Sequence, residues 1–262
     1  MSDAVSCDYV RYGKRDDHIA VVTLDRPDKR NAINGAMARA IDAIVKDSEA
    51  DDEVWLTILT AAGPVFSAGA DLAEAAAGRG QDLVTPDGGF AGFVDSVRVK
   101  PWIAAIHGAA VGGGLEMALA CDIRLCGPDS IFGLPEVKRG LIAGGRGAYR
   151  LARHVPRGIA LEMLATGDPI PAEKAVHWGL VNQVAADGDV LAAAIALGQR
   201  ICANAPLSVR ESLSIGRVAI EHSDRDLARM TDEAGQRLAT TADYQEGPRA
   251  FMEKRAPLWT GR

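Results

Sequence analysis

The stretch "AVGGGLEMALACD", from Ala110 to Asp122, places three consecutive glycines at the start of an apolar, helix-like run. Glycine costs a helix interior about 1 kcal/mol per residue relative to alanine, so the triplet needs a reason. A helix N-terminus offers unpaired N–H groups and a partial positive charge, and glycines let a ligand approach them closely. The stretch therefore suits a backbone oxyanion-binding site, although close packing of Gly112, Gly113 and Gly114 would explain the triplet equally well.

A second small-residue turn offers similar donors. In "PVFSAGADLAE", residues 64–74, the turn at Ala68, Gly69 and Ala70 follows a strand end and precedes a helix start at Asp71. Two such turns after neighbouring strands can converge on one carbonyl oxygen. Small-residue turns are common, so this motif gains weight only beside the first one.

Two carboxylates accompany these turns. Glu116 follows the glycines by one helical turn, and Glu136 follows Pro135 where the chain leaves a strand. A carboxyl group in an apolar pocket has a raised pKa and can act as acid or base near neutrality. Two facing carboxylates can hold one water, which suits adding or removing water across a polarised double bond. The alternative is that Glu116 pairs with a core arginine and that Glu136 is a solvated loop residue.

The order of the predicted elements indicates an α/β fold. Helical patterns alternate with three β-rich runs: "HIAVVTLDRP" (18–27), "VWLTILTAAG" (54–63) and "WIAAIHG" (102–108). The first helical pattern is expected to be capped by Asn34. Shorter strands are expected in "DIRLCG" and "SIFGLPE". This order favours right-handed βαβ crossovers and a mainly parallel sheet, and helices predominate after Gly145.

Three further segments carry expectations of their own. The Gly-rich stretch 78–92 is predicted to be a long mobile loop of the kind that covers a binding site. His107 is expected to be a structural hydrogen bonder at a strand end. His154 and His177 are expected on solvated helix faces.

Bulk composition limits the partners of the chain. Its 262 residues are 48% apolar, which is ample for a packed core, and its net charge of −6 argues against sequence-independent binding of nucleic acid. We find no run of eighteen apolar residues and no apolar leader, so neither a membrane nor a secretory route is expected. The pattern predicts a soluble, cytoplasmic protein without a metal site, and its four cysteines (Cys7, Cys121, Cys126 and Cys202) are expected to be reduced thiols.

Five segments together resemble the enoyl-CoA hydratase (crotonase) superfamily. They are "VTLDRPDKRNAIN", "FSAGADLAE", "KPWIAAIHGAAVGGGLEMALACDIRLC", "FGLPEVKRGLIAGG" and "GDPIPAEKAVHWGLVNQV". The resemblance extends from about His18 to Trp259. It implies an α/β spiral of ββα units over residues 1–200, followed by a helical region, residues 201–262, used for trimer formation. A homotrimer or a dimer of trimers is therefore expected.

The resemblance also implies an acyl-CoA thioester as substrate, with no separate cofactor because coenzyme A is part of that substrate. By position, the N–H groups of Ala70 and Gly113 would hold the thioester oxygen. Glu116 and Glu136 match the two catalytic glutamates of hydratases, which bind and activate the water, with Glu136 handling the proton at the α-carbon. The CoA site would be lined, largely through backbone atoms, by Lys29, Arg30, Ala32, Ala68, Asp71 and Leu72.

The activity that the resemblance implies is reversible hydration of a 2-enoyl-CoA, a reaction of fatty acid metabolism. The segments "VTPDGGFAGF" and "EGPRAFMEKRAPLWTGR" resemble the branch of carnitinyl-CoA dehydratases, which are also crotonobetainyl-CoA hydratases. A double-bond isomerase is a further alternative, disfavoured by the second glutamate. A non-catalytic member that binds acyl-CoA or RNA is disfavoured by both glutamates and by the acidic charge.

One segment departs from the family pattern. In "GLIAGGRGAYRL", Ala143 stands where the family usually has proline, and Arg146-Gly147 where it usually has two glycines. We expect Arg146 to pair with Glu136 or to meet a polar acyl group, and its charge disfavours a cationic, carnitine-type substrate. Near the end of the sequence, Lys254 and Arg255 form either a plain charged face or a contact with a CoA phosphate across a subunit boundary.

Overall fold

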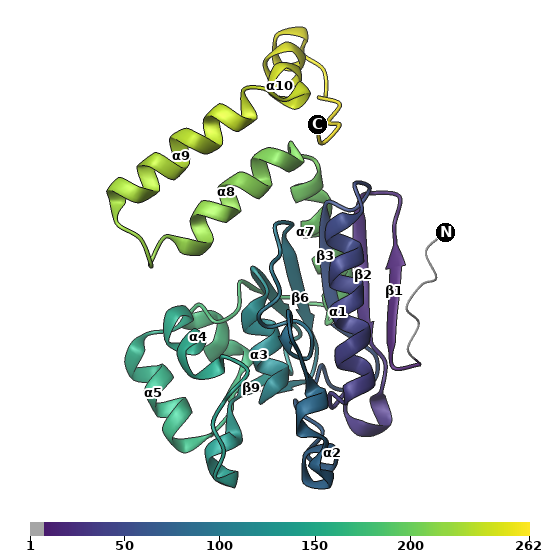
Figure 1. Cartoon of the computed structure of the whole chain (residues 1–262), viewed down its shortest axis with the longest axis vertical. Helices are drawn as coiled ribbons and strands as arrows, with labels where there is room; N and C mark the ends of the chain where they lie inside the picture. The colour runs from purple at the N-terminus through teal and green to yellow at the C-terminus, as the bar shows by residue number, and fades with distance from the viewer. Residues whose placement is uncertain (1–7) are drawn as a thin grey trace.

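The computed structural model describes residues 8–262, and a six-stranded sheet forms its centre (Figure 1). The strand order is β1-β2-β3-β6-β8-β11; β1 pairs antiparallel with β2, and every later neighbour pairs in parallel. The mainly parallel sheet expected from the alternation of strands and helices is confirmed. The strands are β1 (Val10–Lys14), β2 (Ile19–Leu24), β3 (Leu56–Ala61), β6 (Trp102–Ile106), β8 (Ile123–Cys126) and β11 (Gln183–Val184).

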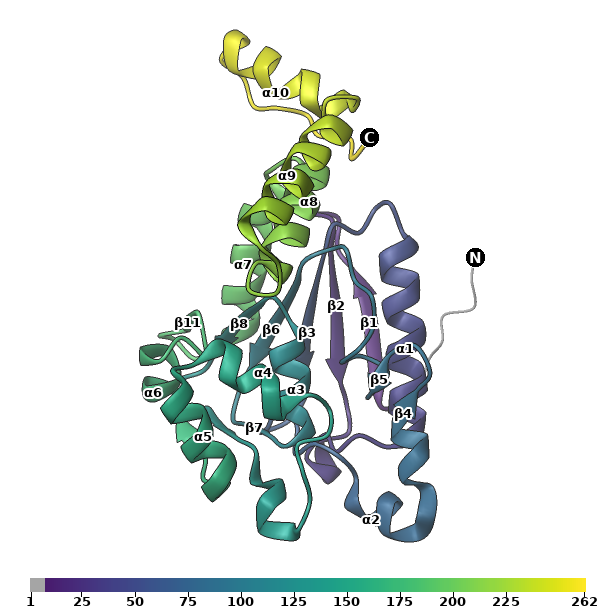
Figure 2. The ribbon, with the colours of Figure 1, turned by 60° about the vertical axis from the view of Figure 1, so that its left-hand side comes forward.

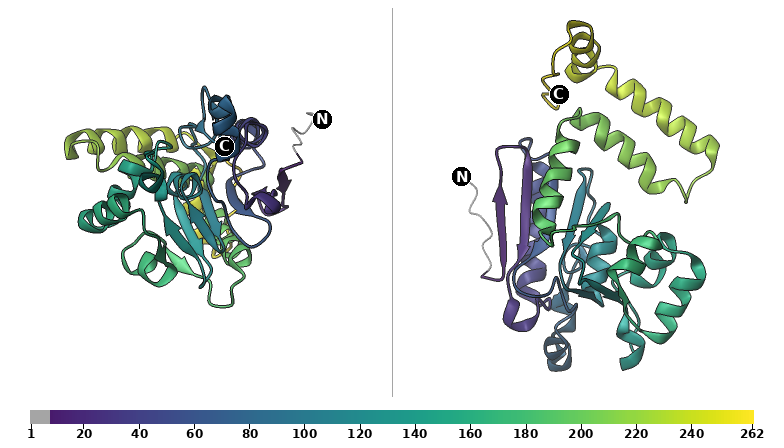
Figure 3. Two further views of the ribbon diagram at one scale, coloured as in Figure 1. Left: turned by 90° about the horizontal axis from the view of Figure 1, so that it is seen from below. Right: turned by 180° about the vertical axis from the view of Figure 1, so that it is seen from behind.

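Helices cover both faces of this sheet. Leu59 of β3 belongs to the apolar cluster that includes α1 (Gly35–Ala50), whereas Leu56 and Ile58 pack in a second cluster with α7 (Val190–Cys202). Figure 3 shows α7 on the face of the sheet opposite α1. Because both faces are buried, the strand sequences are almost continuously apolar.

The predicted cap of the first helix is confirmed. The Asn34 side chain accepts a hydrogen bond of 2.9 Å from the N–H of Met37, which satisfies one of the free donors of α1.

A second, three-stranded sheet lies below the first and gives the fold its spiral. It contains β7 (Ala109–Val111), β9 (Ile131–Gly133) and β10 (Ile170–Pro171), with β7 and β9 parallel. The chain passes from β6 to β7 and from β8 to β9, and α3 (Gly113–Ala120) follows directly on β7. This is the ββα repeat that the family resemblance implies, and it brings the starts of helices to the end of the molecule seen at the bottom of Figure 2.

Short helices after β9 complete this lower layer. They are a 3-10 helix η4 (Pro135–Arg139), α4 (Gly147–His154), α5 (Arg157–Thr166) and α6 (Ala172–His177).

Three helices extend away from the upper end of the sheet (Figures 1 and 2). They are α8 (Pro206–Val218), α9 (Asp224–Leu238) and α10 (Ala242–Glu253), all within the predicted helical region 201–262. The division of the chain at residue 200 and the use of these helices in trimer formation stay predictions. Arg255, beyond α10, forms ion pairs with Glu246 and Glu253.

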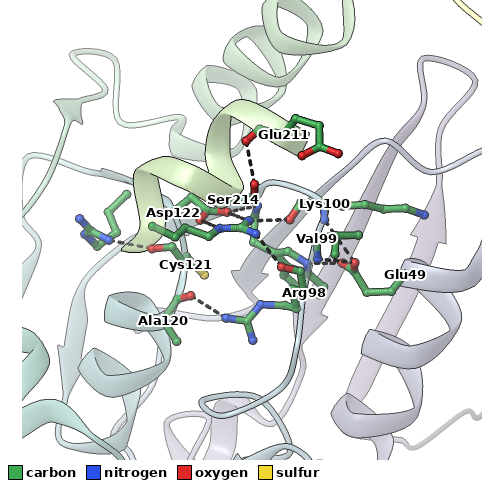
Figure 4. Close-up of polar contacts among 12 residues, drawn as sticks. Glu49, Arg98, Val99, Lys100, Ala120, Cys121, Asp122, Glu211 and Ser214 are labelled. Carbon is green, nitrogen blue, oxygen red and sulfur yellow. Dashed lines mark hydrogen bonds and ion pairs between the residues drawn. The ribbon is translucent and has the colours of Figure 1, made fainter. Parts of the chain in front are cut away.

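A polar junction joins α8 to the sheet. Arg217 donates to both carboxylate oxygens of Asp122, at 2.7 and 2.8 Å, and to the carbonyls of Arg98 and Lys100. In the same region, Glu49 of α1 accepts a hydrogen bond of 2.8 Å from the N–H of Val99, which lies between Arg98 and Lys100. Figure 4 shows this junction, with Asp122 next to α8. Arg217 thus ties the end of α8 to the sheet through one forked guanidinium.

The segment 78–92, predicted to be a long mobile loop, contains short regular elements. After α2 (Leu72–Glu74) and a wide turn over Ala75–Arg79, it forms a 3-10 helix, Gly80–Leu83, and a hairpin of β4 (Val84–Thr85) and β5 (Gly89–Phe90). The physical reason is an anchor on α1, because the Thr85 hydroxyl donates to the Asp42 carboxylate at 2.8 Å.

The prediction that His154 is solvated is wrong. His154 is half-buried, and its Nδ1 accepts from the guanidinium of Arg124 on β8 at 3.3 Å. Burial lowers the pKa of His154 to about 4, and the neighbouring Arg124 charge acts in the same direction. His177 is exposed, as expected.

Residues 8–262 contain neither a disulfide nor a cluster of metal-ligating side chains. Cys121, Cys126 and Cys202 are free thiols, whereas Cys7 lies outside the described residues. Within the same range, no three histidine, cysteine or carboxylate side chains gather as metal ligands. No single described helix is long and apolar enough to cross a membrane, and α7 with α8 meets the criterion only as a pair bent by 107°.

Candidate active site

One cavity of about 860 Å³ gathers the site residues expected from the sequence. It lies between the α2–β5 segment and the η4–α4 segment. All ten predicted residues line it: Lys29, Arg30, Ala32, Ala68, Ala70, Asp71, Leu72, Gly113, Glu116 and Glu136. Their roles remain predictions, but the structure brings them to one place.

The two small-residue turns meet at the backbone. Gly69 has a φ of +88° and packs so closely on the start of α3 that a Cβ there would lie 2.6 Å from the nitrogen of Gly113. Within the described part of the chain, neither the Ala70 N–H nor the Gly113 N–H donates to another group. Two amide donors from separate turns are therefore available side by side, which is the geometry of an oxyanion hole.

Gly113 also carries a packing requirement. A side chain at this position would overlap the ring of Phe90 on β5, which covers the first turn of α3. Both explanations offered for the glycine triplet therefore apply at Gly113, since its lack of a side chain permits the packing and leaves its N–H accessible from the cavity.

Glu116 is held inside the cavity wall with 3% of its surface exposed. Its Oε1 accepts the N–H of Gly147, the first residue of α4, at 2.9 Å. Burial raises the pKa of Glu116 to about 7, assisted by the charge of Glu136 and opposed by the hydrogen bond from Gly147. Among the described residues no lysine or arginine forms an ion pair with Glu116, so the alternative of a core arginine partner is wrong.

Glu136 lies on η4 and turns toward the same space. Its Oε1 is 3.3 Å from where a Cβ of Gly112 would stand, at the entrance to α3. Its Oε2 is buried and has no hydrogen-bond partner in the described part of the chain. Burial raises the pKa of Glu136 as well. Glu136 is therefore not a solvated loop residue, and its free oxygen can accept a proton from a ligand.

The predicted CoA end of the cavity is built on an ion pair. Arg26 donates to the Asp71 carboxylate at 2.7 Å, and this contact holds the pKa of Asp71 below its ordinary value. Asp71 also caps α2 by accepting the N–H of Ala73. The pair joins the turn that carries Lys29 and Arg30 to the start of α2. Asp71 therefore shapes this end of the cavity by fixing the backbone around it.

The expectation that Arg146 pairs with Glu136 is wrong. Arg146 instead forms two hydrogen bonds with the Asp95 carboxylate, at 3.0 and 2.8 Å. The reason is the backbone at residue 146, which has a φ of +78° and directs the chain into α4. Asp95 and Phe90 both line the cavity and were not among the predicted site residues, because the segment around them reads as a loop.

His107 takes the structural role expected for it. Its Nε2 lies 2.8 Å from the carbonyl oxygen of Gly63, at the turn between β6 and β7.

The fold and the cavity together define a crotonase-type protein, and comparison with known proteins agrees. A sequence model described as enoyl-CoA hydratase/isomerase matches residues 14–262. The chain therefore belongs to the enoyl-CoA hydratase/isomerase family of the crotonase superfamily, whose substrates are acyl-CoA thioesters. The resemblance and the fold class expected from the sequence are confirmed.

Similar proteins carry two kinds of name. A carnitinyl-CoA dehydratase from Salmonella typhi is 37% identical over 254 residues, which are 95% of this chain and 97% of that protein. The structure of an enoyl-CoA hydratase from Mycobacterium tuberculosis H37Rv matches with a TM-score of 0.93 at 40% identity, covering 97% of this chain and 100% of that one. A carnitinyl-CoA hydratase from Mycobacterium avium matches with a TM-score of 0.75 at 42% identity, covering 98% and 100%. Named relatives thus divide between hydratase-type lyases of two substrate classes.

Proposed function

We propose that this chain catalyses the reversible addition of water to a 2-enoyl-CoA thioester. One observation carries the proposal: two carboxyl groups with raised pKa values, buried Glu116 and half-buried Glu136, line the same cavity as two converging, unused amide donors. Membership in the family supports an acyl-CoA substrate.

The amides supply the electrostatic part of the reaction. The N–H groups of Ala70 and Gly113 donate to the thioester oxygen, which withdraws electrons from the conjugated double bond and stabilises the enolate-like transition state. Loss of one such donor typically costs about 3–4 kcal/mol of transition-state stabilisation.

The two glutamates move the protons. A water between them loses a proton to a carboxylate as its oxygen bonds to the β-carbon, and Glu136 in its acid form delivers a proton to the α-carbon. Because the pKa of Glu116 is about 7, both of its protonation states are populated near neutral pH, as a group that exchanges protons in both directions requires.

The remaining predicted residues bind the coenzyme. Lys29 and Arg30 supply positive charge for its phosphates, and Ala32, Ala68 and Leu72 line the same end of the cavity. A homotrimer or a dimer of trimers is part of the proposal. Exposed apolar side chains on α10, including Phe251, support it, because association would bury them.

A carnitine-type dehydratase is the second candidate, favoured by the names of relatives at 37% and 42% identity. A double-bond isomerase receives less support, since it does not need the second glutamate.

The test measures hydration of crotonyl-CoA and crotonobetainyl-CoA by loss of the ultraviolet absorbance of the enoyl thioester. We expect Glu136→Gln to lower kcat by at least about a thousandfold and to change binding of the CoA ester by less than about threefold. The matched control is Glu162→Gln, at an exposed carboxylate on α5. Full activity of Glu136→Gln would exclude the two-glutamate mechanism.

A further inference from the structure

We propose that the Arg146–Asp95 ion pair selects the charge of the acyl group: Arg146 occupies Asp95 and thereby excludes acyl groups that carry a cation at their distal end. This inference rests on the proposed function, because it concerns the acyl end of the same site.

The ion pair lies next to the reacting end of the cavity. Gly145 and Gly147, on either side of Arg146, both touch the Glu116 carboxylate; a Cβ on Gly147 would lie 2.9 Å from its Oε1. Arg146 therefore stands immediately beside a group that acts on the double bond. Asp95 approaches from the opposite wall, in the segment after Phe90.

The direction of the substrate follows from the positions of the amides. Arg30 accepts the N–H of Ala68 through its carbonyl at 2.9 Å, which places the cationic turn of residues 29–30 beside the Ala70 donor. A thioester oxygen on Ala70 and Gly113, with the double bond reaching Glu116, directs the acyl chain away from that turn. Beyond the two glutamates and the cationic turn, the charged groups that line this end of the cavity are Arg139, Arg146 and Asp95, and Arg146 and Asp95 form an ion pair.

The backbone of Asp95 is held independently of Arg146. Its N–H donates to the carbonyl of Gly88 at 2.9 Å, and its carboxylate packs against Gly89 in the hairpin. Of the other aspartates that line the cavity, Asp71 is already paired with Arg26 and Asp28 belongs to the Lys29 turn. Among the described residues that line this end of the cavity, Asp95 is therefore the one carboxylate other than Glu116 and Glu136.

Arg146 neutralises that carboxylate. Both residues line the cavity, and their side chains are 47% and 31% exposed, so the pair is accessible to a bound acyl group. A quaternary ammonium brought to this point would meet the guanidinium and find the carboxylate occupied. A neutral chain encounters a pair with no net charge and is accepted.

Arg146→Gly is the informative change. The left-handed φ of residue 146 suits glycine, so the variant removes the guanidinium without straining the start of α4. It leaves Asp95 as an unpaired carboxylate next to the acyl chain.

The experiment measures dissociation constants by calorimetry for two unreactive saturated thioesters, butyryl-CoA and γ-trimethylammoniobutyryl-CoA. The wild type should prefer butyryl-CoA by at least about tenfold. Arg146→Gly should tighten binding of the cationic thioester by about tenfold and alter that of butyryl-CoA by less than about twofold. Adding Asp95→Asn should remove the gain. Arg153→Gln, on the same helix with its charge paired to Glu221, should leave the preference unchanged.

The outcomes separate this inference from the proposed function. Equal wild-type affinities, or an unchanged preference in Arg146→Gly, would overturn it while hydration of crotonyl-CoA by the wild type still stood. Failure of the wild type to bind either thioester would overturn both. A gain in Arg146→Gly that survives Asp95→Asn would show that Asp95 does not recognise the cation, and would also overturn it.

Discussion

The backbone N–H of Gly147 is 2.9 Å from Oε1 of Glu116, so the first residue of α4 holds a carboxylate on the first turn of α3. Two helix starts therefore meet at one side chain. The N-terminus of α4 stabilises the charged form of Glu116, yet burial outweighs it and the pKa is raised. This balance leads to the first prediction.

Glu116→Gln should stabilise the protein above neutral pH. The pKa of Glu116 rises from 4.5 in the unfolded chain to about 7 in the fold, so the unfolded state releases its proton first. The wild type therefore loses stability as pH rises from about 4.5 to 7, by at most about 3 kcal/mol. Gln keeps an acceptor for Gly147 but has no proton to lose. Thermal unfolding at pH 5 and pH 8 checks this; a melting temperature that falls equally in both proteins would contradict it.

Gly113→Ala should destabilise the fold by about 1–3 kcal/mol, because the new methyl group overlaps the ring of Phe90. The double variant Gly113→Ala/Phe90→Ala removes the overlap, so it should be more stable than the sum of the two single changes predicts. Chemical denaturation of the four proteins forms a double-mutant cycle. Simple additivity would mean that the two residues do not touch.

Arg217→Ala should cost about 2–4 kcal/mol, because it leaves Asp122 and two carbonyls without their shared donor at the base of α8. Arg217→Lys should restore little, since an ammonium lacks the planar fork. The matched control is Arg237→Ala on α9, whose pair with Glu211 is exposed and should be worth less than about 1 kcal/mol. Denaturation midpoints of the three variants and the wild type measure these changes in stability. Similar losses of stability in Arg217→Ala and Arg237→Ala would contradict the prediction.

His154→Gln should make the protein less sensitive to acid. The pKa of His154 falls from 6.5 in the unfolded chain to about 4 in the fold, so below pH 6.5 the unfolded state binds the extra proton. The wild type therefore loses stability as pH drops from 6.5 toward 4. Gln still accepts from Arg124 and does not titrate. Urea unfolding at pH 7 and pH 5 measures this, with His177→Gln as the exposed control. Parallel loss in wild type and His154→Gln would disprove it.

Much of the fold could be predicted from the sequence, because local capping and turn signals indicated the same elements as the pattern of apolar residues. The cap at Asn34 and the apolar strands are short-range features that chain chemistry determines directly. The spiral of ββα units came from the family resemblance, since no local rule states which short strand joins the second sheet.

The site was predictable where it depends on backbone turns and less so where it depends on distant partners. The turns at residues 68–70 and 112–114 can be recognised in the sequence by their small residues. The pairing of Arg146 with Asp95 joins two loops that are far apart in the sequence. It also involves a left-handed backbone at residue 146, which the presence of an arginine does not predict. His154 was misjudged for a related reason, because its partner Arg124 lies on a strand of another layer.

The contact between Gly69 and Gly113 has an evolutionary consequence. The two amides of the proposed oxyanion hole are fixed by main chain against main chain, with no side chain between them. Wall residues such as Val94, Leu141 and Ile142 belong to other segments of the same cavity. Descendants of this chain could therefore acquire new acyl substrates by drift in those walls while inheriting the reactive centre intact.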